Sequence, residues 1–424
     1  MKHKILDNEK NPHILESLYR SNPQEFKNAL LEIYTENPDS EIFKVWYERL
    51  FFEDTTENKI ETKKRKISCD FFIILLFCIL AGLLVKLPDF IKFIKYDIFY
   101  MRNLSFFFLP FITIYYLIQK KANWRYWLII LLPIILSAVY INLLPESIIP
   151  NKMSDTFILA CIHMPFFTWF ISGFGFILPE LKDIGKRIEF LKLNGEIFVY
   201  TALMIAGLIV LSGSTYLLFS AGGLDATNVS TKWVLPIGLV SSPIVAMNLV
   251  YNNEKIVKLA PLLSRIFAPL FSLTLLVFLG FIFSHIRNPF PNRDFLLFVN
   301  LFLLLVVVIS TLVLIHKMPN QKTNFSDYNN FILLISSFIV EIFASVNVLL
   351  RLTTFGFTPN RLALIGLNVI ILIHLIGMII NYIKWFTKKA DNSMCLKFVA
   401  NYIPVYFYWS IFIVFVFPWI FSLR

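Results

Sequence analysis

A series of long apolar runs, separated by short polar segments, begins near residue 68 and continues to the end of the chain. The run FLLFVNLFLLLVVVISTLVLI (295–315) is typical, and its apolar residues are continuous rather than alternating, which is unlike a barrel strand. About 20 helical residues cross the roughly 30 Å of hydrocarbon in a bilayer. The pattern therefore predicts an all-α, polytopic helical membrane bundle of eleven spans, near residues 68–87, 104–119, 126–145, 156–178, 197–219, 233–251, 262–283, 295–316, 331–350, 361–382 and 399–421.

The first 66 residues have a different pattern. Two Asn-Pro pairs divide residues 11–53 into segments with helical apolar spacing, as in EFKNALLEIY (25–34), where every third or fourth residue is apolar. This predicts a small cytosolic helical module followed by a polar linker that ends in KKRK, with residues 1–66 as one domain and residues 67–424 as the multi-pass domain. About 45 residues is small for independent stability, so we expect the module to dock on a cytosolic partner or on the inner loops.

Composition supports a membrane protein and changes how the charge is interpreted. Hydrophobic residues make up 57% of the chain and charged residues only 16%, with a mean hydropathy of +0.68. A soluble domain carries about a quarter charged residues. The net charge of +11 comes from the part after residue 66, where lysines and arginines flank spans. We therefore expect membrane lipids, and not a nucleic acid, to be the partners of these basic residues.

The distribution of lysine and arginine between alternate loops predicts an orientation. Loops on the side of the amino terminus carry the larger share of the basic residues, which places the amino terminus in the cytosol. Trp124, Trp127 and Trp385 stand where spans meet that side, as interfacial aromatic residues do.

Motifs for chemistry are scarce. The four cysteines show no CxxC spacing and indicate neither a disulfide framework nor a metal site. No cofactor-binding pattern is found, and HExxH, GxSxG and P-loop signatures are absent from the sequence. An enzyme is therefore the less favoured class, although an intramembrane hydrolase or lipid transferase that uses Glu341 and His374 stays open.

Two ionisable residues fall at mid-membrane depth. Glu341 lies in the ninth span between Ser337 and Ser345, and these polar positions share a helix face that should contact other helices rather than lipid. His374 lies in the tenth span, within about 5 Å of the depth of Glu341. We consider two interpretations: a proton or cation relay, and a buried hydrogen bond that fixes helix packing.

Two arginines border the connection between the same spans. Arg351 and Arg361 either extend to the outer interface and end their helices, or together attract a carboxylate or phosphate. Gly356 and Pro359 make the connection tight, and Asn360 is placed to cap the tenth span.

Three further polar residues are assigned by position. Arg265 lies a turn inside the cytosolic edge of the seventh span, where we expect it to reach lipid phosphate. Asn347 and Asn368 lie within spans, where hydrogen bonding between helices is the common use of an amide.

Two stretches carry a resemblance to a known family. The run LSRIFAPLFSLTLLVFLGFIF (263–283), together with RLTTFGFTPNRL (351–362), resembles the bacterial multi-pass membrane family known as domain of unknown function 4153. The segment from NPHILESLYR (11–20) to FKVWYERL (43–50) resembles the cytosolic extension of its members from Bacteroidota. The resemblance extends over about residues 160–385. It implies a location in the bacterial cytoplasmic membrane, and it transfers no catalytic residue.

These observations lead to two functional hypotheses. The first is transport or flipping of a small or lipidic anion, with Arg351 and Arg361 at the outer mouth and Glu341 with His374 titrating inside. The second is a non-transporting sensor or assembly factor that recruits a cytosolic partner through residues 11–53.

Overall fold

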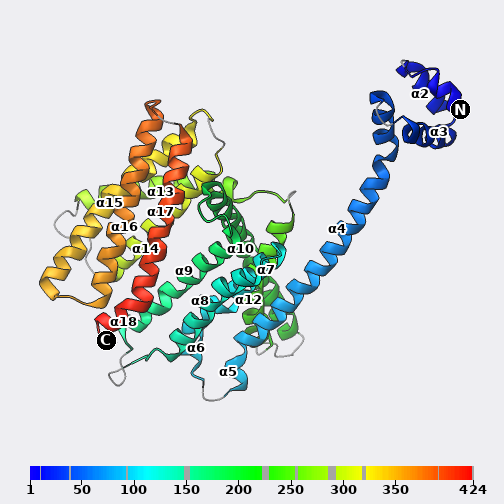
Figure 1. The fold of residues 1–424 in the computed structure, drawn as a ribbon. Coiled ribbons are helices and arrows are strands. Elements are labelled where there is room, and N and C mark those ends of the chain that lie inside the picture. The colour runs from blue at the N-terminus through cyan, green and yellow to red at the C-terminus, as the bar shows by residue number, and fades with distance from the viewer. Residues whose placement is uncertain are drawn as a thin grey trace. The chain divides into compact units, whose positions relative to one another are not determined.

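The computed structural model describes residues 1–9, 11–37, 40–91, 94–147, 153–221, 229–253, 256–284, 293–317, 321–389 and 391–422, except for the side chains of residues 24, 51–68, 293 and 294. All regular secondary structure in these ranges is helical (Figure 1). Contacts divide the chain into two units, Met1–Leu75 and Leu76–Arg424.

The first unit is built from short helices that begin at Asn-Pro pairs. It contains α1 (Lys2–Leu6), α2 (Pro12–Ser21), α3 (Pro23–Glu36) and the start of α4 (Glu41–Val85). Asn11 and Asn22 cap α2 and α3 by accepting from the backbone N–H groups of Ile14 and Glu25. Proline at the first helical position suits this arrangement, because it has no N–H to satisfy.

The unit has its own hydrophobic core, which includes Phe26, Leu30, Ile33 and Trp46. Ile5 of α1 is fully buried in this core, so the helical module begins before residue 11, contrary to the prediction. A helix of five residues has too few turns to show an apolar period. The polar linker predicted after the module is also helical, because α4 continues through it without a break.

Ten described helical segments are long and apolar enough to cross a bilayer, which fits an integral membrane protein. They comprise α6 (Tyr96–Asn103), η1 (Leu104–Phe107) and α7 (Leu109–Gln119) as one segment; α8 (Trp124–Leu143); α9 (Asp155–Ile177); α10 (Ile184–Ala221); η2 (Ser230–Val234) with α12 (Leu235–Asn252); α13 (Ala260–Ser284); α14 (Arg293–Ile315); α15 (Phe325–Phe355); α16 (Pro359–Phe386); and α17 (Asn392–Ile411) with η3 (Phe412–Val416) and α18 (Phe417–Ile420). The short α5 (Leu87–Phe90) follows α4.

These segments overlap the second to eleventh predicted spans, and the first predicted span corresponds to Cys69–Val85, a shorter apolar stretch of α4. Several predicted boundaries were wrong. The second span begins at Tyr96 rather than 104, and α10 begins at Ile184 rather than 197. Hydropathy marks only the part of a helix that is apolar, whereas backbone hydrogen bonding continues into polar turns.

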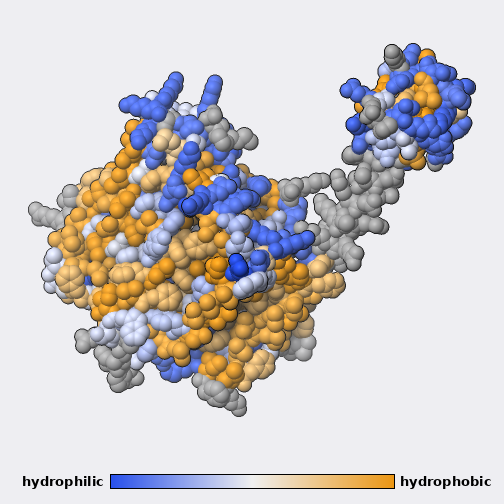
Figure 2. Space-filling view, viewed as in Figure 1, coloured by the Kyte–Doolittle hydropathy of each residue, from blue (hydrophilic) through white to orange (hydrophobic). Residues whose placement is uncertain are grey.

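Helix α15 is central to the packing of the second unit. It packs on α13, α14 and α16, and α16 packs in turn on α17; α9 packs on both α7 and α8 (Figure 1). Buried residues of α15 such as Val340 and Ala344 belong to one core with residues of α13 and α14. Figure 2 shows apolar residues over much of the visible surface of this unit, as expected for helices in contact with lipid.

The α16–α17 interface depends on close approach at Gly377. A side chain at this position would collide with the ring of Phe398 on α17, whereas nothing lies within 4 Å of a side chain placed at Gly207 on α10. We expect Gly377→Val to destabilise the protein by about 1–3 kcal/mol, because the two helices must separate. Thermal unfolding in detergent should show a lower midpoint for this variant and an unchanged midpoint for Gly207→Val; equal midpoints would contradict this packing.

Candidate functional site

Glu341 of α15 is fully buried among helices. Its Oε1 accepts a hydrogen bond from Ser345 Oγ at 3.2 Å, and its Oε2 has no hydrogen-bond partner among the described residues. No described lysine, arginine or histidine forms an ion pair with it. Burying an unpaired carboxylate is expensive. The polar face predicted for Ser337, Glu341 and Ser345 is turned toward other helices. Its Glu341 Oε2 accepts no hydrogen bond from the described residues.

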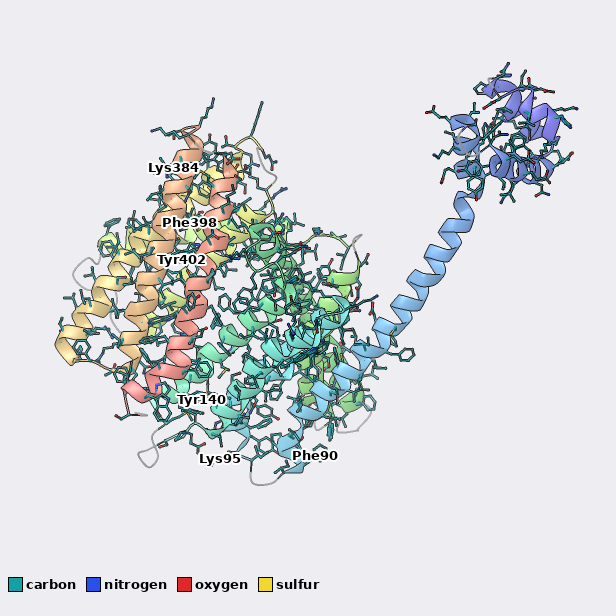
Figure 3. All side chains as sticks on the ribbon, viewed as in Figure 1. Phe90, Lys95, Tyr140, Lys384, Phe398 and Tyr402 are labelled. Carbon is teal, nitrogen blue, oxygen red and sulfur yellow. The ribbon has the colours of Figure 1, made fainter. Side chains whose placement is uncertain are left out.

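His374 of α16 is also buried, in an aromatic pocket formed by α17. A hydrogen bond of 2.9 Å joins its Nδ1 to the hydroxyl of Tyr406. The ring centroids of Phe398, Tyr402 and Tyr406 lie 5.8, 4.7 and 5.7 Å from that of His374. Figure 3 shows Phe398 and Tyr402 on α17, beside α16. The other ring nitrogen, Nε2, has no partner among the described residues.

Tyr406 connects the two ionisable residues. The sequence predicts that Glu341 and His374 could meet, but no direct hydrogen bond or ion pair joins them. Tyr406 instead bonds to His374 and lies within electrostatic range of Glu341. The group thus spans α15, α16 and α17, and sequence reasoning missed its third member. In the sequence, the feature that could have indicated Tyr406 is its spacing from Tyr402, one helical turn away on α17.

The polar face of α15 continues from Glu341 toward its amino-terminal end. Ser337 Oγ donates to the carbonyl of Leu333 at 2.6 Å. Two turns before Ser337, the fully buried Asn330 donates to the Tyr382 hydroxyl at 2.7 Å and accepts from Ser310 Oγ at 2.7 Å. The face is therefore a row of buried polar groups rather than one isolated carboxylate.

The row ends at a buried ion pair between Lys317 and Asp327. Both side chains are almost completely inaccessible, and the Lys317 ammonium also lies 4.3 Å from the ring of Trp385. Asp327 additionally accepts from the backbone N–H of Asn324 and so completes the cap of α15. Lys317 was predicted only as a loop charge, because its burial depends on helices that are distant in sequence.

A second buried carboxylate lies near this ion pair. Glu196 of α10 accepts from the backbone N–H groups of Leu259 and Ala260 at 2.9 and 3.1 Å, which holds the start of α13. Its other oxygen lies 3.9 Å from Nε2 of His316. Arg265 is exposed and lines a small cleft of about 20 Å³ together with His316, Lys317 and Asp327. Its contact with lipid phosphate stays a prediction.

Arg361 caps a helix. Its Nη1 donates to the carbonyls of Phe355 and Gly356 at 2.8 Å each, at the carboxyl end of α15. Gly356 has φ of +77°, a conformation that favours glycine and ends the helix. The cap of α16 is Thr358, whose hydroxyl accepts from the N–H of Arg361, and not Asn360 as predicted. Asn360 lies two residues after the cap position, because α16 already begins at Pro359.

The remaining predicted residues have two different environments. Arg351 Nε donates to Asn347 Oδ1 at 3.1 Å, one turn back on α15, so this pair is formed within one helix rather than between helices. Asn368 is fully buried in α16, and neither its amide nitrogen nor its amide oxygen has a hydrogen-bond partner among the described residues. The described hydrogen bonds of these two amides include no bond between helices, and their role in helix packing stays a prediction.

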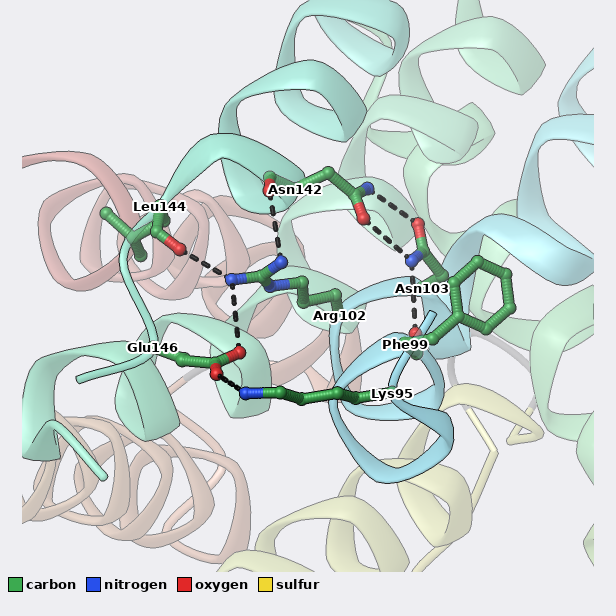
Figure 4. Close-up of polar contacts among 7 residues, drawn as sticks. All are labelled: Lys95, Phe99, Arg102, Asn103, Asn142, Leu144 and Glu146. Carbon is green, nitrogen blue, oxygen red and sulfur yellow. Dashed lines mark hydrogen bonds and ion pairs between the residues drawn. The ribbon is translucent and has the colours of Figure 1, made fainter. Parts of the chain in front are cut away.

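A polar cluster around Arg102 joins α6 to the end of α8 (Figure 4). Arg102 donates to the carbonyls of Asn142 and Leu144 at 3.1 and 2.7 Å. Its guanidinium and the Lys95 ammonium both face Glu146, at 3.9 and 2.5 Å. The side-chain amides of Asn103 and Asn142 bond reciprocally. These donors serve a helix end, neighbouring amides and the Glu146 carboxylate, so we assign the cluster a structural role.

Comparison of the chain with protein-family models, curated proteins and solved structures gave no match. The fold and the buried polar groups define the class, namely an all-α protein whose ten described apolar segments fit a polytopic membrane protein. Beyond this class, function must be argued from the site.

The Lys317–Asp327 pair should be sensitive to loss of one partner. We expect Lys317→Gln to lower the free energy of unfolding by about 3–5 kcal/mol, because Asp327 is left buried without a cation. The double variant Lys317→Gln/Asp327→Asn should regain part of this loss. Unfolding in mixed detergent micelles provides the measurement. Lys95→Gln, at a largely exposed lysine, serves as the control and should cost no more than about 1 kcal/mol.

Proposed function

We propose that this protein is a proton-coupled transporter or flippase for a small or lipidic anion. The observation that carries the proposal is the fully buried Glu341, with one carboxylate oxygen unpartnered and no ion-paired cation among the described residues. A carboxylate kept in such surroundings serves function in most membrane proteins, because a merely structural role is filled at lower cost by a neutral residue.

Glu341, His374 and Tyr406 form the proton-handling group in this proposal. Glu341 holds the exchangeable proton, and the Tyr406 hydroxyl and the imidazole of His374 pass it between α15 and α17. The buried polar row from Asn330 to Asp327 supplies groups that conduct the proton toward the Lys317 end of α15. Two observations support this proton path. The residues of the row are buried, and Glu341 and His374 each have an atom without a hydrogen-bond partner among the described residues.

Anion attraction is assigned to Arg351 and Arg361. Arg351 lies near the carboxyl end of α15 and Arg361 in the first turn of α16, and the helix-capping bonds of Arg361 use only its Nη1 nitrogen. A guanidinium has five N–H donors in a planar fork, so Arg361 retains donors that suit a carboxylate or phosphate.

We further propose eleven spans, with the apolar end of α4 as the first, and a cytosolic amino terminus in a bacterial cytoplasmic membrane. Lys384 and Lys95, which belong to opposite predicted sides, lie at opposite ends of the helices of the second unit (Figure 3). Membership of the family known as domain of unknown function 4153 is proposed on the resemblance described above.

Proton coupling predicts a specific defect in Glu341→Gln. In proteoliposomes with an imposed pH gradient, the variant should lose proton-coupled anion flux, because glutamine cannot exchange a proton. Glu189→Gln, at an exposed carboxylate of α10, should retain the flux of the native chain. The native rate in Glu341→Gln would contradict the proton-carrying role.

Eleven spans place the two chain ends on opposite sides of the membrane, whereas ten spans place them on the same side. We expect green fluorescent protein to fluoresce when fused before Met1 and not when fused after Arg424. Alkaline phosphatase, which folds only outside the cytosol, should be active at the carboxyl end. Fluorescence at both ends would contradict the proposed first span.

The rival function is recruitment of a cytosolic partner without transport. It is favoured by one observation, the separate core of the Met1–Leu75 unit, whose Arg49 both pairs with Glu16 at 2.9 Å and covers the Trp46 ring at 4.8 Å. Removal of residues 1–53 distinguishes the two functions. We expect the shortened chain to keep its anion flux, whereas the rival predicts no flux in either chain and loss of a bound partner.

A further inference from the structure

A cavity of about 390 Å³ opens where the α7–α8 turn meets the α9–α10 turn. Its volume falls within the range of about 300–1,000 Å³ found for small-molecule sites. Polar lining residues come from both turns and are Lys120, Lys121, Asn123, Tyr126, Glu180 and Lys186. The cavity lies on other helices than Glu341, so its role does not depend on the proposed transport mechanism.

The charge around the cavity is basic, with three lysines against one carboxylate. Lys120 is positioned by the end of α9, because its ammonium donates to the carbonyls of Phe176 and Leu178, the latter at 2.8 Å. Burial, and after it the charge of Lys186, lower the pKa of Lys120. The Lys121 side chain forms no ion pair or hydrogen bond with the described residues. Lys186 pairs with Glu189 at 2.9 Å, whereas neither Lys120 nor Lys121 forms an ion pair with a described carboxylate.

An apolar surface begins beside the cavity. Trp124 at the start of α8 is 67% exposed, and Leu128, Leu132 and Leu136 follow it at helical spacing with 56%, 46% and 58% exposure. These residues form one stripe along α8, because they recur every four positions. An acyl chain placed along this stripe has its polar end at the level of the lysines.

We infer that the cavity is a binding site for the phosphate-bearing headgroup of an anionic phospholipid. Lys120, Lys121 and Lys186 contact the phosphate and the α8 stripe contacts the acyl chain. Basic pockets at the ends of membrane helices recognise anionic headgroups in this way. A free phosphate would satisfy the lysines, but it would leave the adjoining apolar stripe unused. The lipid accounts for both observations.

The test is native mass spectrometry of the full chain in detergent, titrated with phosphatidylglycerol and, separately, with phosphatidylcholine of the same acyl chains. Phosphatidylglycerol should bind more tightly. Lys121→Gln should weaken the binding of phosphatidylglycerol about fivefold. The variant Lys120→Gln/Lys121→Gln/Lys186→Gln should weaken it about fivefold for each lysine removed. The control Lys384→Gln/Lys388→Gln/Lys389→Gln removes the same charge at the end of α16 and should bind like the native chain.

Three results would overturn the inference. The first is equal loss of phosphatidylglycerol in the cavity variant and the control, which indicates a general charge effect. The second is equal affinity for the two lipids. The third is complete displacement of the lipid by millimolar inorganic phosphate, which identifies free phosphate as the ligand. Lys121→Gln keeps the test valid if the triple variant fails to fold, because the Lys121 side chain forms no hydrogen bond or ion pair with the described residues.

Discussion

The interior of a bilayer offers no hydrogen-bond partners, and this constraint governs the structure. Backbone groups are satisfied within helices, and polar side chains must face other helices. Helix α15 shows the result most clearly. Its apolar residues contact α13, α14 and α16, while one face collects Asp327, Asn330, Ser337 and Glu341, all buried. The bundle is therefore organised around a polar row that lipid could not accommodate.

Four charged groups of the second unit serve helix ends. Arg102, Lys120 and Arg361 each donate to carbonyls at the carboxyl end of a helix, on α8, α9 and α15 respectively. Glu196 makes the converse contact, accepting N–H groups at the start of α13. Helix ends leave such groups unpaired, and a charged partner is the strongest solution in an apolar setting. Against this background the unpartnered atoms of Glu341 and His374 differ, because they complete no helix end.

Local patterns were sufficient for some of these features and not for others. The spacing of Ser337, Glu341 and Ser345 predicted a buried face, because residues four apart share a side of a helix. Gly356 and Pro359 predicted a tight connection between the ninth and tenth spans, and α15 ends directly before Gly356, whose backbone conformation few other residues adopt. Tyr406 was missed, since nothing near it in sequence indicates which histidine it meets. Arg361 was predicted either to end its helix at the outer interface or to attract an anion. Its bonds to the carboxyl end of α15 were missed, because they depend on how the connection between α15 and α16 folds back.

The sequence by itself determined the class of protein. Apolar runs of bilayer length have no stable alternative to spanning helices, and the separate amphipathic segment before them predicted a small helical module. Only the tertiary structure decided which polar groups meet. Lys317 pairs with Asp327, Glu196 holds α13, and Tyr406 bonds to His374. Helix rotation and depth set these contacts, and both result from packing among many side chains, which hydropathy along one chain does not encode.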